Sequence, residues 1–264
     1  MASQLQRYFN LRVKNLFNHL HDFELTGGEV PLHDLRVELK KLRALIKFLR
    51  TVYPGQKLKR SSQSLRTIFR EAGEIREYQV MQQWLNKTIL PDMHRVYFPE
   101  EKLKNMITVF HDGSASIKKG LKEIIEQCGG FIHSTNHILP EQYMAELHGK
   151  IEKMLRRPLP SGDWHEFRKL VKQWMYATGW VKNDEDAKTD FLFSHLNKLQ
   201  EIMGQWHDLE VIKDCFAQRQ IYLSPDIAIQ KDFGKAWEKL DHSIKYKEKQ
   251  VEDMLSKIPV TERV

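Results

Sequence analysis

The chain has 264 residues, with 42 Lys and Arg against 35 Asp and Glu, which gives a formal net charge of +7. Two cysteines exclude a disulfide framework and a four-thiolate metal site, and no apolar run reaches the roughly 18 residues that a membrane span needs. The length fits one large domain or two small ones, and 41% hydrophobic residues suffice for a core. The N-terminus lacks the hydrophobic region of a signal peptide, so we expect a cytoplasmic protein.

Glycine and proline are scarce, at 13 and 9 residues, and both disfavour helix interiors, which predicts an all-α protein. In the first half the breakers delimit helices at about 5–25, 32–52, 61–85 and 100–128. The last of these is expected to break near Gly113 and to end at Gly129-Gly130. No segment shows the alternating pattern of a strand.

The second half repeats this order. Helices are expected at about 140–157, 164–181, 190–217 and 226–256, with a polar loop at 183–188 and a turn at Ser224-Pro225. Four tryptophans of this half are assigned to the core, namely Trp164, Trp174, Trp180 and Trp206.

Two motifs recur between the halves. The motif that begins at His33 returns 132 residues later at His165, and each is followed by a lysine, Lys40 or Lys172. A second stretch around Gly73 returns 131 residues later around Gly204. The shared order and spacing indicate an internal duplication, with a first helical half at 1–138 and a second at 139–264 related by pseudo-two-fold symmetry.

The positive charge is concentrated in one segment. Residues 33–76 contain twelve Lys and Arg against four Asp and Glu, a net charge of +8, so that the remainder of the chain carries −1. Charge of one sign gathered in one place implies an oppositely charged partner more strongly than a diffuse basic composition does.

Five of these cations form a stripe along one helix. At 100° per residue they fall within about 40° of one line, and no carboxylate interrupts them. The stripe consists of Arg36, Lys40, Arg43, Lys47 and Arg50. It could be an ordinary solvated face. Because like charges four residues apart repel by about 0.2–0.5 kcal/mol per pair, a polyanion that neutralises the row is the competing interpretation.

The next helix adds cations on one face. Lys59, Arg66 and Arg70 lie within about 40° of one another on the wheel, and Gly73 continues that face. A glycine inside a helix costs about 1 kcal/mol relative to alanine. Gly73 therefore indicates either tight helix packing or the close approach of a ligand or another backbone.

The sequence shows no catalytic or metal-binding set. His33 and His165 have cations at helical spacing, and cations repel a metal ion. The chain lacks HExxH, paired-cysteine and glycine-rich phosphate-loop motifs, and His207-Asp208 has no visible nucleophile beside it. We therefore expect no metal, no cofactor and no enzymatic activity.

The motif from His33 to Arg43, followed by the stretch from Gly73 to Val80, resembles the CHAD domain, the conserved histidine α-helical domain. Its usual motifs are H-x-x-R-V-x-x-[RK]-[RK]-L-R and G-x-x-R-D-x-D-V. The resemblance extends over nearly the whole chain. It implies two four-helix bundles around a basic groove or channel, and non-catalytic binding of inorganic polyphosphate.

Carried over to this sequence, the resemblance implies phosphate contacts in both halves, at His33, Arg36, Lys40, Arg43, Arg76, His165, Arg168, Lys172 and His207. The basic faces of the two helices add Lys47, Arg50, Arg66 and Arg70 to this set.

This chain departs from the family pattern at several positions. Glu77 and Gln79 stand where two aspartates are usual. In the second half three positions of the basic faces lose their cations, because the counterparts of Arg43, Arg66 and Arg70 are Met175, Asn197 and Glu201. We therefore expect the first half to supply most of the binding energy.

A nucleic acid is the alternative partner for the same basic surface. It is disfavoured because the stripe has no interleaved aromatic residues for base stacking and few amides for base edges. We expect no membrane partner, and the resemblance to a polyphosphate-binding family suggests an association with polyphosphate granules.

Overall fold

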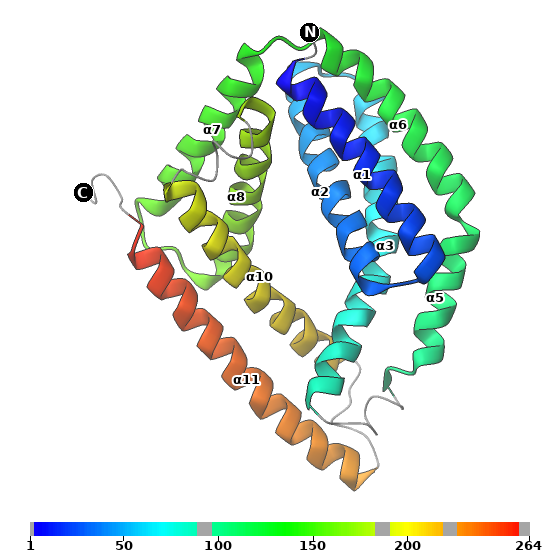
Figure 1. The fold of residues 1–264 in the computed structure, drawn as a ribbon. Coiled ribbons are helices and arrows are strands. Elements are labelled where there is room, and N and C mark those ends of the chain that lie inside the picture. Colours follow the sequence, from blue (N-terminus) through cyan, green and yellow to red (C-terminus); the bar gives the residue numbers. More distant parts are fainter. Residues whose placement is uncertain (1–2, 89–96, 183–190, 219–225, 259–264) are drawn as a thin grey trace. The chain divides into compact units, whose positions relative to one another are not determined.

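The protein is all-helical over the residues that the computed structural model describes, which are 3–88, 97–182, 191–218 and 226–258 (Figure 1). The all-α expectation is confirmed. The helices in this part of the chain are α1 (Gln4–Thr26), α2 (Glu29–Val52), α3 (Gln56–Thr88), α5 (Glu100–Asp112), α6 (Ser114–Ser134), α7 (Ile138–Leu155), α8 (Ser161–Val181), α10 (Phe191–Gln218) and α11 (Ile227–Ser256).

Helices α2 and α3 both begin earlier than the sequence suggested. Pro31 lies in the first turn of α2, where its missing N–H is tolerated because the first amides of a helix have no partner within the helix. Helix α3 starts directly after Pro54-Gly55, because no breaker follows them and Leu58 is buried in the core.

Helix α6 corrects one expectation and confirms another. The break near Gly113 is present, between the end of α5 and the start of α6. The expected end at Gly129-Gly130 is wrong, since α6 continues to Ser134. The two glycines weaken the helix by about 1 kcal/mol each. This is offset because Ile132 is buried and Phe131 packs on the tyrosine that caps α2, with ring centroids 5.3 Å apart.

Two expected connections, the loop at 183–188 and the turn at Ser224-Pro225, lie outside the described residues. The helix after that turn has a clear start. The side chain of Asp226 accepts hydrogen bonds from the backbone N–H groups of Ala228 and Ile229, which caps α11.

The chain divides into two compact units, each built from separate segments. One unit comprises Met1–Gln79, Glu101–Glu146 and Gln173–Ala187, and the other comprises Val80–Glu100, Leu147–Lys172 and Lys188–Val264. The division into halves at 1–138 and 139–264, with two four-helix bundles, stays a prediction.

In the first unit, α1 packs along α2, and α6 contacts both (Figure 1). Helix α2 buries one broad face, with leucines or isoleucine at the helical spacing of a core face, namely Leu35, Leu39, Leu42, Ile46 and Leu49. This burial fixes the rotation of α2 and thereby leaves the basic stripe away from the core.

In the second unit, α10 and α11 run antiparallel and pack together (Figure 1). Aromatic side chains fill much of its interior. Trp164 is buried and meets the half-buried Trp206 edge-on, with ring centroids 5.1 Å apart. Trp174 and Trp180, which belong to the first unit, are buried as expected.

None of the helices in the described ranges is both long and apolar enough to cross a bilayer.

Candidate functional site

The exposure of the stripe changes along α2. Arg36, Lys40 and Arg43 are half-buried, whereas Lys47 and Arg50 near the end of the helix are exposed. The three half-buried cations lie around Phe69 of α3. We refer to Arg36, Lys40, Arg43, Arg66 and Arg70, together with Phe69, as the first cluster; all belong to the first unit.

An aromatic ring from α3 lies among these cations. The guanidinium carbons of Arg36 and Arg43 each lie 4.5 Å from the ring centroid of Phe69, and the ammonium of Lys40 lies 5.8 Å from it. Cations within about 6 Å of a ring face are attracted by the ring quadrupole. Phe69 therefore contacts cations from two successive turns of α2.

Arg36 is held against the backbone of α3. Its Nη1 donates a hydrogen bond to the carbonyl oxygen of Phe69 at 3.2 Å. A Cβ atom at Gly73 would lie only 2.5 Å from that same Nη1. The glycine is thus needed because the side chain of Arg36 lies across α3 at this point, which is the tight helix packing that the sequence offered as one interpretation.

Three arginines of the first cluster have no acidic partner in the described part of the chain. Among the described residues, no carboxylate forms an ion pair with Arg43, Arg66 or Arg70. Burial lowers the pKa of Arg43, and the charge of Arg66 lowers it further. Desolvation and a like charge both disfavour a cation, so the arrangement is electrostatically suited to an incoming anion.

Lys47 is oriented by a buried polar chain. Its ammonium donates to the Oε1 of Gln173 at 2.7 Å, and the Nε2 of Gln173 donates to the hydroxyl of Tyr143. Gln173 and Tyr143 are buried. The position of this stripe lysine is therefore fixed by groups in the core.

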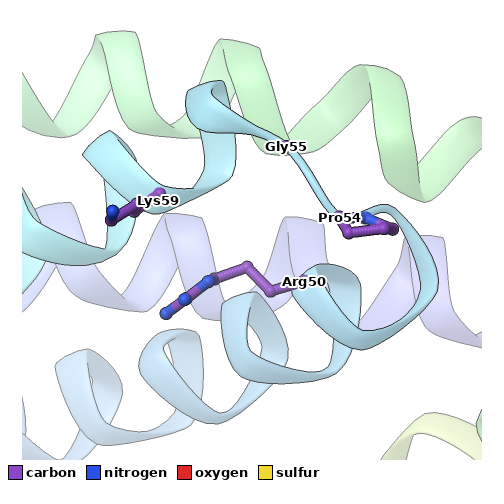
Figure 2. A pocket seen from close by; sticks show the side chains of 4 residues that line it. All are labelled: Arg50, Pro54, Gly55 and Lys59. Carbon is purple, nitrogen blue, oxygen red and sulfur yellow. The ribbon is translucent and has the colours of Figure 1, made fainter.

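A small pocket lies at the end of the stripe. It has a volume of about 280 Å³ and is lined by Arg50, Pro54, Gly55 and Lys59 (Figure 2). Arg50 comes from the last turn of α2 and Lys59 from the first turn of α3. The Nη1 of Arg50 also lies 3.5 Å from the hydroxyl of Ser62. The pocket thus places two more cations at the turn between these helices.

Two other cations of the basic segment, Lys41 and Arg76, are paired with acids. The buried carboxylate of Glu38 accepts from Arg12 at 3.1 Å and from Lys41 at 2.8 Å. Arg76, which the sequence assigned to phosphate, forms an ion pair with Glu29. His33 is exposed near the start of α2. Three arginines of the first cluster, Arg43, Arg66 and Arg70, differ from these cations because they pair with no carboxylate within the described residues.

A second cluster lies in the second unit and consists of His165, Arg168, Lys172 and His207. Its arginine repeats the arrangement of Arg36. The Nε of Arg168 donates to the carbonyl oxygen of Gln200 at 3.0 Å, and a Cβ at Gly204 would lie 2.7 Å from its Nη2. Because Gln200 and Gly204 correspond to Phe69 and Gly73 at the offset of 131, the contact recurs as the sequence repeat does.

The two histidines of the second cluster face each other, with ring centroids 4.7 Å apart. Burial lowers the pKa of His165, and the charges of Lys169 and His207 add to this effect. The Nδ1 of His165 is buried and neither accepts nor donates a hydrogen bond in the described part of the protein. His165 is thus biased toward the neutral form in the absence of an anion. In the same part of the chain, no group of three His, Cys, Asp or Glu side chains converges as a metal site would require.

The remaining positions of the second unit differ in kind. Asn197, the counterpart of Arg66, donates to the carboxylate of Glu201, the counterpart of Arg70, at 3.0 Å. A neutral amide and an acid thus replace two cations, as the sequence indicated.

Phe69 and Gln173 are functional candidates that sequence reasoning missed. A wheel of α3 places Phe69 at the border of the face that carries Arg66 and Arg70, so periodicity could have found it. No comparable signal exists for Gln173, because it lies 126 residues from Lys47.

Comparisons with known proteins agree with this architecture. Residues 12–129 match the model of the CHAD domain family. The crystal structure of the CHAD domain from the plant Ricinus communis superposes with a TM-score of 0.65 at 17% identity, over 98% of this chain and 93% of that one. This likeness shows the fold. A search of curated proteins finds no significant match.

Proposed function

We propose that this chain, which carries a CHAD domain, binds inorganic polyphosphate through the first cluster and does not catalyse a reaction on it. CHAD domains are associated in general with polyphosphate binding. The observation that carries the proposal is a set of arginines that pair with no carboxylate within the described residues, namely Arg43 of the stripe and Arg66 and Arg70 of α3.

A linear polyanion suits a linear row of cations. Arginine offers paired donors to phosphate oxygens, and lysine offers a mobile point charge. A bound phosphate beside Arg43 would offset the desolvation and the repulsion from Arg66 that lower its pKa. Neutralising several phosphates releases counterions, so the affinity should fall steeply as salt is added.

The same geometry disfavours a single-stranded nucleic acid. Bases are held by stacking on free aromatic faces. The ring of Phe69 already contacts three cations, so it does not offer such a face within the first cluster. We therefore place polyphosphate ahead of nucleic acid as the partner, and expect the protein in the cytoplasm with polyphosphate granules.

The proposal is tested by titrating the protein with long-chain polyphosphate, single-stranded DNA and RNA at matched phosphate and salt concentrations. We expect polyphosphate to bind at least about tenfold more tightly, a difference of about 1.4 kcal/mol. Equal affinities would contradict the assignment to polyphosphate. Gel analysis of the polyphosphate after prolonged incubation should show an unchanged length distribution, and shortening would contradict the non-catalytic role.

A further inference from the structure

Phe69 is the aromatic residue around which the first cluster is arranged. It lies on α3 between the two faces of that helix and is half-buried, whereas its neighbours Leu65 and Ile68 are buried in the core. Packing in the core therefore does not by itself explain the position of the Phe69 ring. It lies next to three cations of α2 instead.

Phe69 restrains Arg36 in two ways. The ring lies 4.5 Å from the guanidinium carbon of Arg36, and the backbone carbonyl of the same residue accepts the hydrogen bond of Arg36 at 3.2 Å. Arg43 has the ring contact at 4.5 Å without a carboxylate partner among the described residues. For Arg43 the ring is thus the main attractive contact against burial and the like charge of Arg66.

We propose that Phe69 is a positioning residue, which orders Arg36, Lys40 and Arg43 before polyphosphate arrives. This inference rests on the proposed function. Binding normally costs the ordering of long side chains at the interface. Side chains already held on a ring have lost that freedom in the unbound protein, so more of the electrostatic attraction appears as affinity.

The position of the second cluster that corresponds to Phe69 does not carry an aromatic ring. The counterpart of Phe69 is Gln200, which supplies the carbonyl for Arg168 but has an amide side chain that donates to Asn197 at 3.0 Å. The hydrogen bond from an arginine to a backbone carbonyl is thus present in both units. Of the two corresponding residues, Phe69 and Gln200, only Phe69 also offers an aromatic ring to the arginine. Phe69 accordingly sets the first cluster apart as the stronger binding surface.

Phe69→Leu tests this inference by removing the ring while keeping every charge. We expect polyphosphate affinity to fall about 5- to 20-fold, as contacts of partly buried cations with a ring suggest. The slope of affinity against salt should stay unchanged, since the same cations meet the same phosphates. Phe69→Tyr should keep wild-type affinity. Unchanged or tighter binding of Phe69→Leu would overturn the inference.

A second variant separates the ring's electrostatics from its shape. Pentafluorophenylalanine at position 69 keeps the size of the ring but reverses its quadrupole, so we expect a loss similar to that of Phe69→Leu with thermal stability retained. Wild-type affinity in this variant would show that only shape matters and would overturn the inference.

The proposed function can fail separately. If the wild-type protein does not bind polyphosphate, both proposals fall. If it binds and Phe69→Leu binds equally well, only the positioning role is lost. In the absence of ligand, NMR of the arginine Nε–H groups should show ring-current shifts for Arg36 and Arg43 that disappear in Phe69→Leu, and their absence in the wild type would contradict the arrangement.

Discussion

The two clusters share one arginine–backbone contact and differ in the number of cations around it. In each unit an arginine donates to a backbone carbonyl of the neighbouring helix and lies across a glycine, as Arg36 does over Gly73 and Arg168 over Gly204. The first cluster adds Arg43, Arg66 and Arg70, whereas the corresponding positions of the sequence repeat are Met175, Asn197 and Glu201. The repeat therefore preserves a structural contact, while the charge that suits a polyanion is found mainly in the first unit.

Charge reversal in the first cluster should have the largest effect on polyphosphate affinity. We expect Lys40→Glu with Arg43→Glu to weaken polyphosphate binding more than about 100-fold, because each reversal removes an attraction and adds a repulsion. Lys172→Glu should weaken it less than about fivefold. Both are measured by titration at fixed salt.

A matched double variant on α6, Lys119→Glu with Lys122→Glu, controls for net charge. Both lysines are exposed, and neither forms an ion pair among the described residues. The single variants Lys40→Glu and Arg43→Glu are compared with Lys172→Glu, and equal losses would refute the bias toward the first unit.

Alanine at the two glycines should give the next largest effect. The new Cβ would lie 2.5 Å from Arg36 in Gly73→Ala and 2.7 Å from Arg168 in Gly204→Ala, so each arginine must leave its carbonyl. We expect affinity losses of about tenfold and about twofold respectively. The free energy of unfolding should change by less than about 1 kcal/mol, since alanine is the better helix former. A large loss of stability without loss of binding would contradict this role.

The second cluster should make the stability of the protein depend on pH through His165. The pKa of His165 is lowered first by burial, then by Lys169 and His207; Arg168 also lowers it and Glu166 opposes this. The unfolded chain therefore takes up a proton near the ordinary value of about 6.5 while the folded protein resists it. The contribution of neutral His165 to the free energy of unfolding is therefore present above about pH 6.5 and is lost as the pH falls below that value.

His165→Gln removes this titration. We expect urea denaturation of the variant to show a smaller decrease in the free energy of unfolding between pH 7.5 and pH 5.5 than the wild type shows. Identical pH dependences would mean that His165 does not contribute.

Arg76 should give the smallest effect. Because its guanidinium already pairs with Glu29, we expect Arg76→Gln to change polyphosphate affinity less than about twofold and to lower stability by about 0.2–1 kcal/mol. Titration and thermal unfolding measure the two quantities. A tenfold loss of affinity would show that Arg76 leaves Glu29 to bind the ligand.

Much of the helical order and the basic stripe could be predicted from the sequence, because both depend on local periodicity. The wheel placed Arg36, Lys40 and Arg43 on one face, and the buried leucines of α2 confirm the rotation. The end at Gly129-Gly130 was wrong, because packing beyond those residues outweighs their weak helix propensity.

Contacts between distant residues could not be predicted in this way. The pairing of Arg76 with Glu29 spans 47 residues, and no local pattern shows it. The reason for Gly73 also appears only when α3 is placed beside Arg36. The repeated glycine could be found from the sequence, but the arginine side chain that packs against it could be identified only from the tertiary fold.

The central claim is that the arginines without carboxylates in the first cluster meet phosphates directly. It is tested most directly by the slope of log affinity against log salt concentration for polyphosphate, in the wild type and in the triple variant Arg43→Gln, Arg66→Gln, Arg70→Gln. Each lost phosphate contact should reduce the slope by about 0.7–0.9, so we expect the triple variant to lose about 2–3 in slope together with most of its affinity. An unchanged slope would contradict the account, because it would place the bound polyphosphate elsewhere on the protein.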